Sequence, residues 1–209
     1  MVHFAVSTLL IIVAYLLGSI PTGYLVTRSV KGIDIREHGS GSTGATNVLR
    51  TVGKSAAIAV LAVDLLKGSL ATIVVNVVYA VAPSLLPDWH YWLITATALG
   101  AIIGHSKSIW LNFTGGKSVS TTLGVLFVMS PVVALGTLAS FGVVLGLSRI
   151  VSLSSICGAI AVNILMFALH QPLPYSIFAA VAGLYVILRH QSNIQRILAG
   201  VEPKIGQAS

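Results

Sequence analysis

The chain has 209 residues, of which 56% are hydrophobic and only 8% are charged, and its formal net charge at pH 7 is +7. This composition, with a mean hydropathy of +0.95, excludes an ordinary soluble globular protein and is typical of an integral membrane protein. A single cysteine, Cys157, excludes a disulfide framework and a cysteine-rich metal site. Contact with anionic lipid head groups accounts for the positive charge, so we expect membrane lipid, and no nucleic acid, as a partner.

Apolar runs long enough to cross a bilayer, which takes about 20 residues, recur along the chain. They lie at residues 4–26, 55–82, 91–106, 119–148, 150–170 and 172–188. The first run has neither a basic residue before it nor a prompt cleavage site after it, so we interpret it as a spanning helix and not as a signal peptide. The fourth run contains Ser130-Pro131 near its middle, and it is either one kinked helix or a hairpin of two short helices.

The positions of the basic residues favour the hairpin, because Lys and Arg in short loops concentrate on the cytoplasmic side of a membrane. A single helix would place the basic residues from Arg149 onward on the opposite side from the earlier ones. A hairpin gives seven crossings and gathers on one face Arg28, Lys31, Arg36, Arg50, Lys54, Lys107, Lys117, Arg149, Arg189, Arg196 and Lys204.

We therefore predict an all-α, polytopic membrane protein in which residues 1–209 form a single integral membrane domain. It has seven transmembrane helices, of which the fourth and fifth are short. The N-terminus is external and the C-terminus is cytoplasmic.

Asp64 and Lys67 are the charged residues well inside a predicted span. An unpaired charge at the bilayer centre costs about 2.5 to 3.5 kcal/mol even on the lenient scale. The two residues are three apart and so lie on one helical face. Two interpretations stay open, which are mutual pairing near the cytoplasmic end and a direct role in a site.

A first polar segment, GSGSTGATNVLR at residues 39–50, follows the first span. Its start fits the dinucleotide fingerprint G-x-G-x-x-G, but no buried strand precedes it and a membrane span follows it. Consecutive backbone N–H groups in such a segment can bind an anion, and a flexible loop is the alternative. The residues that favour phosphate binding are the glycines with Ser40, Ser42, Thr43, Thr46, Asn47 and Arg50.

A second polar segment, FTGGKSVSTT, covers residues 113–122. A Walker A motif would need glycine at position 111, where the chain has Leu111, so we exclude a P-loop nucleotidase. What remains is Gly115-Gly116-Lys117 at the predicted cytoplasmic start of a helix, where N–H groups, the positive end of the helix dipole and an ammonium group converge. This predicts a second anion site. The alternative is a lysine that only follows the positive-inside rule.

A third polar segment, LRHQSNIQR at residues 188–196, emerges from the last span. A helical continuation would place His190 and Asn193, three residues apart, on one face. A lone histidine at a membrane edge is more often an interfacial residue than a catalyst, but here it joins two anion sites on the same face. Ser152, Ser154 and Ser155 begin the sixth span, where hydroxyls can cap a helix or meet a ligand.

Few carboxylates accompany these three segments, which argues against a paired-acid hydrolase and a carboxylate-held magnesium site. The sequence contains neither a G-x-S-x-G elbow nor a histidine zinc motif, so we expect no cofactor and no metal. Amide donors, hydroxyls, Lys117, Arg50 and His190 suit two phosphorylated molecules. One would arrive from the cytosol and the other from the bilayer.

Together, GSGSTGATNVLR, the GGK segment with its upstream His105, VSLSSI and RHQSNIQRILAGVE resemble the three motifs of the bacterial acyl-phosphate:glycerol-3-phosphate acyltransferases of the PlsY type. The resemblance covers nearly the whole chain. It implies a seven-helix enzyme of the bacterial inner membrane with a cytoplasmic active site. Such an enzyme moves a fatty acyl group from acyl phosphate to the 1-hydroxyl of glycerol 3-phosphate, giving lysophosphatidate and phosphate for phospholipid synthesis.

The same resemblance assigns roles to residues of this chain. His190, Ser40 and Lys117 are the implied catalytic residues, and either His190 or a substrate phosphate acts as the base. Apart from the resemblance, the position of His105 at the end of the third predicted span suggests that it holds the second segment. The implied substrate-binding residues are Arg50, Ser155, Asn193, Gly41, Thr46, Asn47, Gly115 and Gly116.

The chain departs from the family pattern at two positions, and the segment SKSIWLNFT after His105 also lacks the family's usual proline and carries an extra Lys107. Ser42 stands where asparagine is usual, and Ser118 stands where glycine is usual. A Cβ at position 118 restricts the approach of the backbone to a phosphate, so a diverged paralogue is one alternative. A membrane transporter for an organic phosphate is the other, since basic residues in membrane proteins also mark substrate paths.

Overall fold

The computed structural model describes residues 1–206 and is helical throughout that range apart from turns and one isolated β-bridge. This confirms the all-α prediction. In chain order the helices are α1 (Val2–Ser19), α2 (Thr22–Lys31), η1 (Ile35–Glu37), α3 (Ala45–Thr51), α4 (Lys54–Val81), η2 (Pro83–Leu85), α5 (His90–Ser106), η3 (Ile109–Leu111), α6 (Val119–Met129), α7 (Pro131–Ser148), α8 (Val151–Ala168), α9 (Leu173–Arg189) and α10 (Gln191–Leu198).

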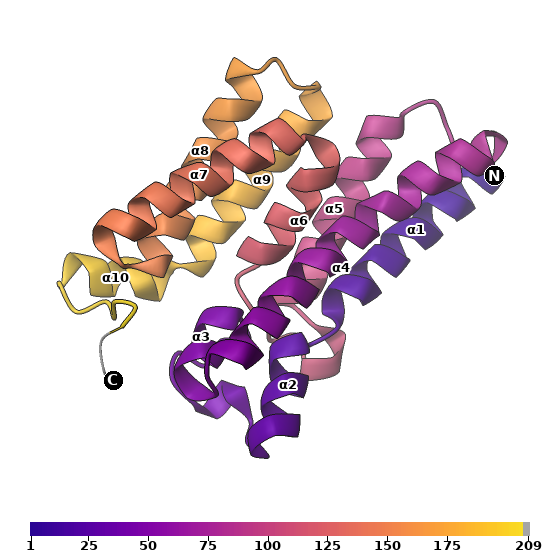
Figure 1. Cartoon of the computed structure of the whole chain (residues 1–209). Coiled ribbons are helices and arrows are strands. Elements are labelled where there is room, and N and C mark those ends of the chain that lie inside the picture. The colour runs from indigo at the N-terminus through magenta and orange to yellow at the C-terminus, as the bar shows by residue number, and fades with distance from the viewer. Residues whose placement is uncertain (207–209) are drawn as a thin grey trace. The chain divides into compact units, whose positions relative to one another are not determined.

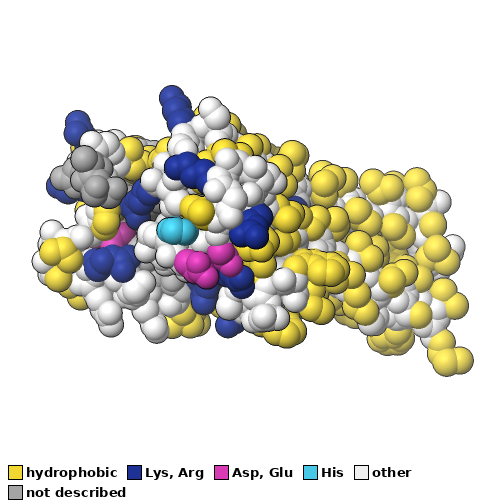
Figure 2. All heavy atoms as spheres, turned by 90° about the horizontal axis from the view of Figure 1, so that it is seen from below, with side chains coloured by type: hydrophobic (Ala, Val, Ile, Leu, Met, Phe, Trp, Pro, Cys, Tyr) yellow, Lys and Arg dark blue, Asp and Glu magenta, His cyan; other side chains and the backbone are white. Residues whose placement is uncertain are grey.

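Several of these helices are long and apolar enough to cross a membrane. Within the described residues they are Val2–Lys31, Lys54–Val81, Pro131–Ser148 and Val151–Ala168, and the bent pair α9 and α10 gives a fifth if it counts as one span. The face drawn in Figure 2 shows extensive hydrophobic surface beside a region where Lys and Arg side chains gather. The protein is therefore a multi-pass membrane protein, while seven crossings and the orientation of the termini stay predictions.

The chain divides into two compact units, residues 1–129 and residues 130–209. In the first unit α1 packs on α5, α4 packs on α6, and the short helices α2 and α3 pack near one end of α4 (Figure 1). Glycines allow these close crossings. A Cβ on Gly124 of α6 would lie 2.0 Å from the carbonyl oxygen of Leu65, and a Cβ on Gly104 of α5 would lie 2.2 Å from that of Tyr15.

The first apolar run forms two helices, where the sequence predicted one. Helix α1 ends at Ser19 and α2 begins at Thr22, with Pro21 between them. Proline supplies no backbone N–H for a continuous helix. The carbonyl of Ile20 instead accepts the N–H of Thr22 at 3.0 Å and the ammonium of Lys67 at 2.9 Å.

The break predicted at Ser130-Pro131 is confirmed, since α6 ends at Met129 and α7 begins at Pro131. Helix α6 has 11 residues, or about 17 Å, which is short for a bilayer core of about 30 Å. Helix α7 has 18 residues, so the prediction that the fifth helix is short is wrong. Proline is well placed at the first position of a helix, and α7 therefore continues until Arg149 adopts a left-handed backbone.

In the second unit α8 packs between α7 and α9, and α10 contacts α8 and α9 (Figure 1). The axes of α9 and α10 differ by 59° at His190. The chain after the last span is thus helical, as the third segment suggested, but it forms a separate helix at an angle to α9. The segment after α10 returns to the turn between α7 and α8, where the N–H of Ile205 donates to the carbonyl of Arg149 at 2.8 Å.

Candidate active site

The glycine-rich segment at residues 39–44 is a loop that folds around the side chain of Asn47. This side chain is buried, and its amide donates to the carbonyls of His38 and Ser42, both at 2.9 Å. Its Oδ1 accepts the N–H of Ser40 at 3.0 Å. A Cβ on Gly39, which has a φ of 58°, would lie 2.2 Å from this oxygen. Asn47, which the resemblance assigns to substrate binding, thus shapes the loop.

Other predicted residues of this segment lie closer to the surface. Ser40, Gly41 and Arg50 are exposed, and Thr46 is half-buried. The N–H of Gly41 donates to the carbonyl of His38 at 3.0 Å, which commits this amide to the loop itself. Side chains, above all those of Ser40 and Arg50, are therefore the groups of this segment that are best placed to meet a ligand.

The second segment, Gly115-Gly116-Lys117, packs against His105 at the end of α5. The N–H of Gly116 donates to the carbonyl of His105 at 3.2 Å. A Cβ on Gly116 would lie 2.1 Å from Nε2 of the same histidine, so residue 116 has to be glycine for this contact. His105 therefore holds the second segment, and Lys117 follows it as a half-buried side chain.

Ser118, where the family pattern has glycine, is in the left-handed region with a φ of 62°. Its side chain is buried against α5, where its hydroxyl donates to the carbonyl of Ile102 at 2.9 Å. The same hydroxyl lies 2.6 Å from the hydroxyl of Ser106. These hydrogen bonds therefore hold the side chain of Ser118 against α5.

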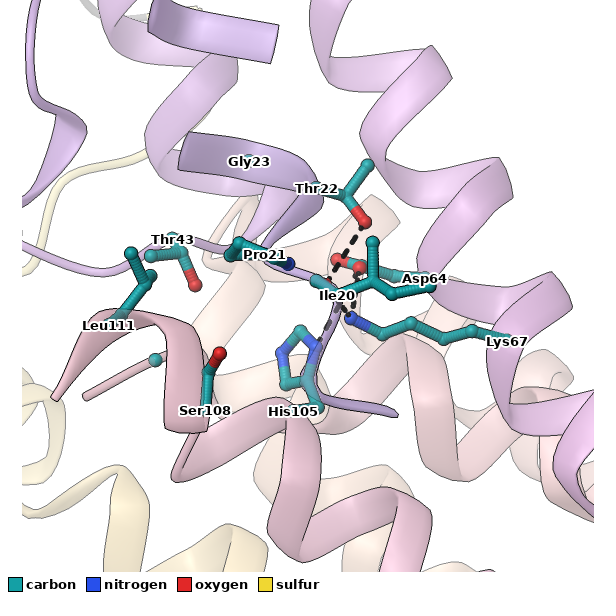
Figure 3. Close-up of a pocket in the computed structure, with 11 residues that line it drawn as sticks. Ile20, Pro21, Thr22, Gly23, Thr43, Asp64, Lys67, His105, Ser108 and Leu111 are labelled. Atoms are coloured by element: carbon teal, nitrogen blue, oxygen red, sulfur yellow. Dashed lines mark hydrogen bonds and ion pairs between the residues drawn. The ribbon is translucent and has the colours of Figure 1, made fainter. Parts of the chain in front are cut away.

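Thr43 of the first segment and Gly115 of the second line one pocket of the first unit, whereas Ser40, Arg50 and Lys117 are not among its lining residues (Figure 3). Among its lining residues Asp64 and Lys67 form an ion pair of 2.9 Å, so the pairing interpretation holds, and their place in the lining leaves a role in a site open. Nδ1 of His105 lies 3.6 Å from the same carboxylate oxygen. The sequence did not indicate that Ile20 and His105 would join this pair. The pocket is lined by Ile20, Pro21, Thr22, Gly23, Thr43, Asp64, Lys67, His105, Ser108, Leu111 and Gly115.

The third segment lies in the second unit, and His190 forms the corner between α9 and α10. Its ring is buried, and Nδ1 lies 2.7 Å from the carbonyl oxygen of Val186. A carbonyl only accepts hydrogen bonds, so Nδ1 carries the proton, and in a neutral ring Nε2 then carries the lone pair. This tautomer gives His190 the form that a general base requires.

Two predicted residues of the second unit, Asn193 and Ser152, contact Glu202, which the sequence analysis did not single out. Oε1 of Glu202 accepts the amide of Asn193 at 2.6 Å and the hydroxyl of Ser152 at 2.7 Å. Oε2 accepts Nε of Arg196 at 2.7 Å. Burial raises the pKa of this carboxyl, but the hydrogen bonds from Asn193, Ser152 and Arg196 outweigh burial and hold the pKa below its usual value.

Ser155, also buried, donates its hydroxyl to the carbonyl of Val151 at 2.9 Å within α8. The side chains of Asn193 and Ser155 thus each have a structural partner. One signal in the sequence did point to Glu202, because it is the single carboxylate after Asp88 in a chain with five. A single carboxylate in a region that contains several hydrogen-bond donors is expected to accept hydrogen bonds from them.

The structure is that of an all-helical membrane protein in which segments rich in glycine, serine and threonine lie near a buried ion pair. The family model described as glycerol-3-phosphate acyltransferase matches residues 8–200. The chain belongs to this family of enzymes. Relatives named glycerol-3-phosphate acyltransferase occur in Rippkaea orientalis, at 67% identity over 97% of this chain and 94% of the relative, and in Crocosphaera subtropica, at 62% identity over 98% and 96%.

Two solved structures have the same fold. Both are described as PlsY (YgiH), an integral membrane glycerol 3-phosphate acyltransferase. The glycerol 3-phosphate form is 37% identical with a TM-score of 0.87, and it covers 96% of each chain. The lysophosphatidic acid form is 36% identical with a TM-score of 0.84, over 96% of this chain and 95% of the other.

Proposed function

We propose that this protein transfers a fatty acyl group from acyl phosphate to the 1-hydroxyl of glycerol 3-phosphate. The observation that supports the proposal is that Thr43 of the glycine-rich loop and Gly115 of the second segment line one pocket in a member of this family. In the reaction the hydroxyl oxygen attacks the acyl carbonyl carbon and an ester bond forms. The bond from that carbon to the phosphate oxygen breaks, and lysophosphatidate and inorganic phosphate are released.

Acyl phosphate is a mixed anhydride with a good leaving group, so the protein needs no covalent nucleophile. Positioning and stabilisation of the developing negative charge provide most of the catalysis. Ser40 and the backbone of Gly115 meet the acyl phosphate. Gly41 and Gly116, whose N–H groups donate to His38 and His105, shape the two segments, and Thr46 and Asn47 support the loop. The acyl tail stays among apolar helices, where each buried methylene contributes about 0.8 kcal/mol.

Glycerol 3-phosphate is held by basic and polar side chains of the three segments. Arg50 and Lys117 neutralise its phosphate, and Ser155 and Asn193 orient it. The proton of the 1-hydroxyl passes either to Nε2 of His190 or to a phosphate oxygen of a substrate. The tautomer set by the carbonyl of Val186 supports the first route.

The membrane arrangement that we propose has seven crossings, formed by α1, α4, α5, α6, α7, α8 and α9. The N-terminus is external, and the C-terminus and the active site face the cytoplasm of a bacterial inner membrane. The support comes from the sequence, because these seven crossings would put the Lys and Arg residues that flank the spans on a single side, as the positive-inside rule requires.

The test is an assay with purified protein, acyl phosphate and radiolabelled glycerol 3-phosphate. The wild type is expected to form lysophosphatidate. His190→Ala and Lys117→Ala are expected to lose nearly all activity while they still insert into the membrane. His170→Ala and Lys54→Ala, at exposed positions, are the matched controls and are expected to retain activity. Absence of product from the wild type, together with phosphate uptake into vesicles, would favour a transporter.

A further inference from the structure

Asp64 and Lys67 lie deep within the first unit, on a helix that is long and apolar enough to span a membrane. Their side chains are only 3% and 5% exposed. Removing two charges from water costs free energy that their attraction does not always return, and apolar residues often replace a buried pair without loss of stability. Stabilisation of α4 therefore does not by itself explain why the chain has an ion pair at this position.

On one side, the pair fixes the break between α1 and α2. Lys67 donates to the carbonyl of Ile20 at 2.9 Å, next to Pro21. Just beyond the break, Gly23 of α2 lies against the backbone of Thr43 in the glycine-rich loop, so closely that a Cβ on Gly23 would be 1.8 Å from the carbonyl oxygen of Thr43. Lys67 thus supports, through the break and α2, the surface on which this loop rests.

On the other side, the pair contacts the histidine that holds the second segment. Nδ1 of His105 lies 3.6 Å from the carboxylate of Asp64. The opposite edge of the same ring faces Gly116, and the carbonyl of His105 accepts the N–H of Gly116 at 3.2 Å. Rotation or displacement of His105 would therefore move the Gly115–Gly116 turn.

We propose that Asp64 and Lys67 are positioning residues, which set the distance and orientation between the glycine-rich loop and the Gly115–Gly116 turn. Neither needs to touch the substrate. The proposal rests on the proposed function for the identity of the ligand, which is the phosphate of acyl phosphate. A single ion pair, through its contacts with Ile20 and His105, holds both segments in place.

The decisive variant is the double substitution Asp64→Asn/Lys67→Met, compared with each single substitution. Each single variant leaves one buried charge without its partner and is expected to lose thermal stability, whereas the neutral double variant regains most of it. The KM for acyl phosphate in the double variant is nevertheless expected to rise about tenfold, since small misplacements of binding groups have large effects. The KM for glycerol 3-phosphate is expected to change less than about twofold.

A second double variant, Asp64→Asn/Lys67→Gln, keeps a hydrogen-bond donor for Ile20 and also serves if the first does not fold. It is expected to recover part of the affinity for acyl phosphate. Recovery of both stability and the wild-type KM by Asp64→Asn/Lys67→Met would overturn the positioning role, because the pair would then contribute to stability alone.

Hydrogen exchange separates failure of this inference from failure of the proposed function. In Asp64→Asn/Lys67→Met, peptides covering residues 39–47 and 113–118 are expected to exchange at least threefold faster, while peptides from α7 and α8 stay unchanged. If the wild type forms no lysophosphatidate, the proposed function fails and the exchange rates alone decide the positioning role. Unchanged exchange in both segments would overturn it.

Discussion

The two units of the molecule pack their helices by different means. In the first unit, glycines bring backbones together, and a Cβ on Gly18, Gly68, Gly104 or Gly124 would lie within 2.0 to 2.2 Å of a carbonyl oxygen of another helix. In the second unit the tightest such distance is 2.8 Å, and Gly142 and Gly146 of α7 have nothing within 4 Å. The first unit thus depends on close backbone contact, and side chains contribute more to the second.

Each unit also buries one carboxylate, and the two are satisfied differently. Asp64 lies within a helix, with Lys67 on the same helix and His105 from α5 beside it. Glu202 follows α10 and accepts hydrogen bonds from Ser152, Asn193 and Arg196. The first acid contacts Lys67 and His105 between the glycine-rich loop and the Gly115–Gly116 turn, whereas the second fastens the segment after α10 to α8 and α10.

The largest effect on this comparison is expected from Gly124→Ala in α6. The new methyl group would lie 2.0 Å from the carbonyl oxygen of Leu65, so α4 and α6 must move apart. Overpacking of this kind typically costs 1 to 3 kcal/mol, and we expect about 3 kcal/mol because backbone cannot yield as a side chain does. The measurement is the free energy of unfolding in mixed micelles.

Gly142→Ala in α7 is the matched control, because the added methyl group meets open space. Its unfolding free energy is expected to change by less than about 0.5 kcal/mol. Equal losses in the two variants would show that close backbone contact does not distinguish the units.

A smaller loss is expected from Glu202→Ala in the second unit. The substitution leaves three donors without their common acceptor, and hydrogen bonds to charged groups contribute about 1.5 to 3 kcal/mol each. Arg196 and the backbone beside residue 202 gain access to water, so we expect about 2 kcal/mol in total. Glu37→Ala, at an exposed acid, is the control with little effect. A Glu202→Ala variant as stable as Glu37→Ala would contradict a fastening role.

The lowered pKa of Glu202 makes part of this stability dependent on pH. A carboxyl with a depressed pKa in the folded state stabilises the fold above its unfolded pKa of about 4.3, and the contribution disappears as pH falls through the folded pKa. Unfolding of the wild type at pH 3 to 5 should therefore be more sensitive to acid than that of Glu202→Gln. Equal acid sensitivity would show that another group titrates. We expect a smaller effect than that of Glu202→Ala.

The sequence allowed much of the architecture to be predicted, because the signals for it are local. Long apolar runs gave the helical class, and Ser130-Pro131 gave the break between α6 and α7. The three-residue spacing of Asp64 and Lys67 placed them on one helical face and made pairing one of two interpretations, and the structure shows the pair. The length of α7 was misjudged, since a proline that interrupts a run also starts a good helix.

The contacts that connect distant segments could not be predicted in this way. Nothing near Asn47 distinguishes an amide that binds substrate from one that shapes a loop, and its role became visible only through His38 and Ser42. The partners of Glu202 are as many as 50 residues away in the chain. Such pairings depend on how helices pack, which a single sequence does not report.

Substitutions of Ser118 would measure how much a side chain at this position, where the family pattern has glycine, contributes to the stability of the first unit. Ser118→Ala keeps the unfavourable left-handed backbone and loses the hydrogen bonds to Ile102 and Ser106. We expect a loss of about 1 kcal/mol in unfolding free energy. Ser118→Gly also loses these bonds but relieves a backbone cost of about 1 kcal/mol, so it should be closer to the wild type. A glycine variant less stable than the alanine variant would contradict this account.

The smallest effect is expected from Asp34→Asn, which completes the comparison of carboxylates. Asp34 accepts hydrogen bonds from Nε and the backbone N–H of Arg36, at 3.0 and 2.9 Å, in much the way that Glu202 accepts Arg196. The side chains of Arg36 and Asp34 are 34% and 18% exposed, so water competes for both charges. Exposed pairs contribute about 0.2 to 1 kcal/mol, and we expect about 0.5 kcal/mol, declining in high salt. A loss as large as that of Glu202→Ala would mean that burial is not what separates the two acids.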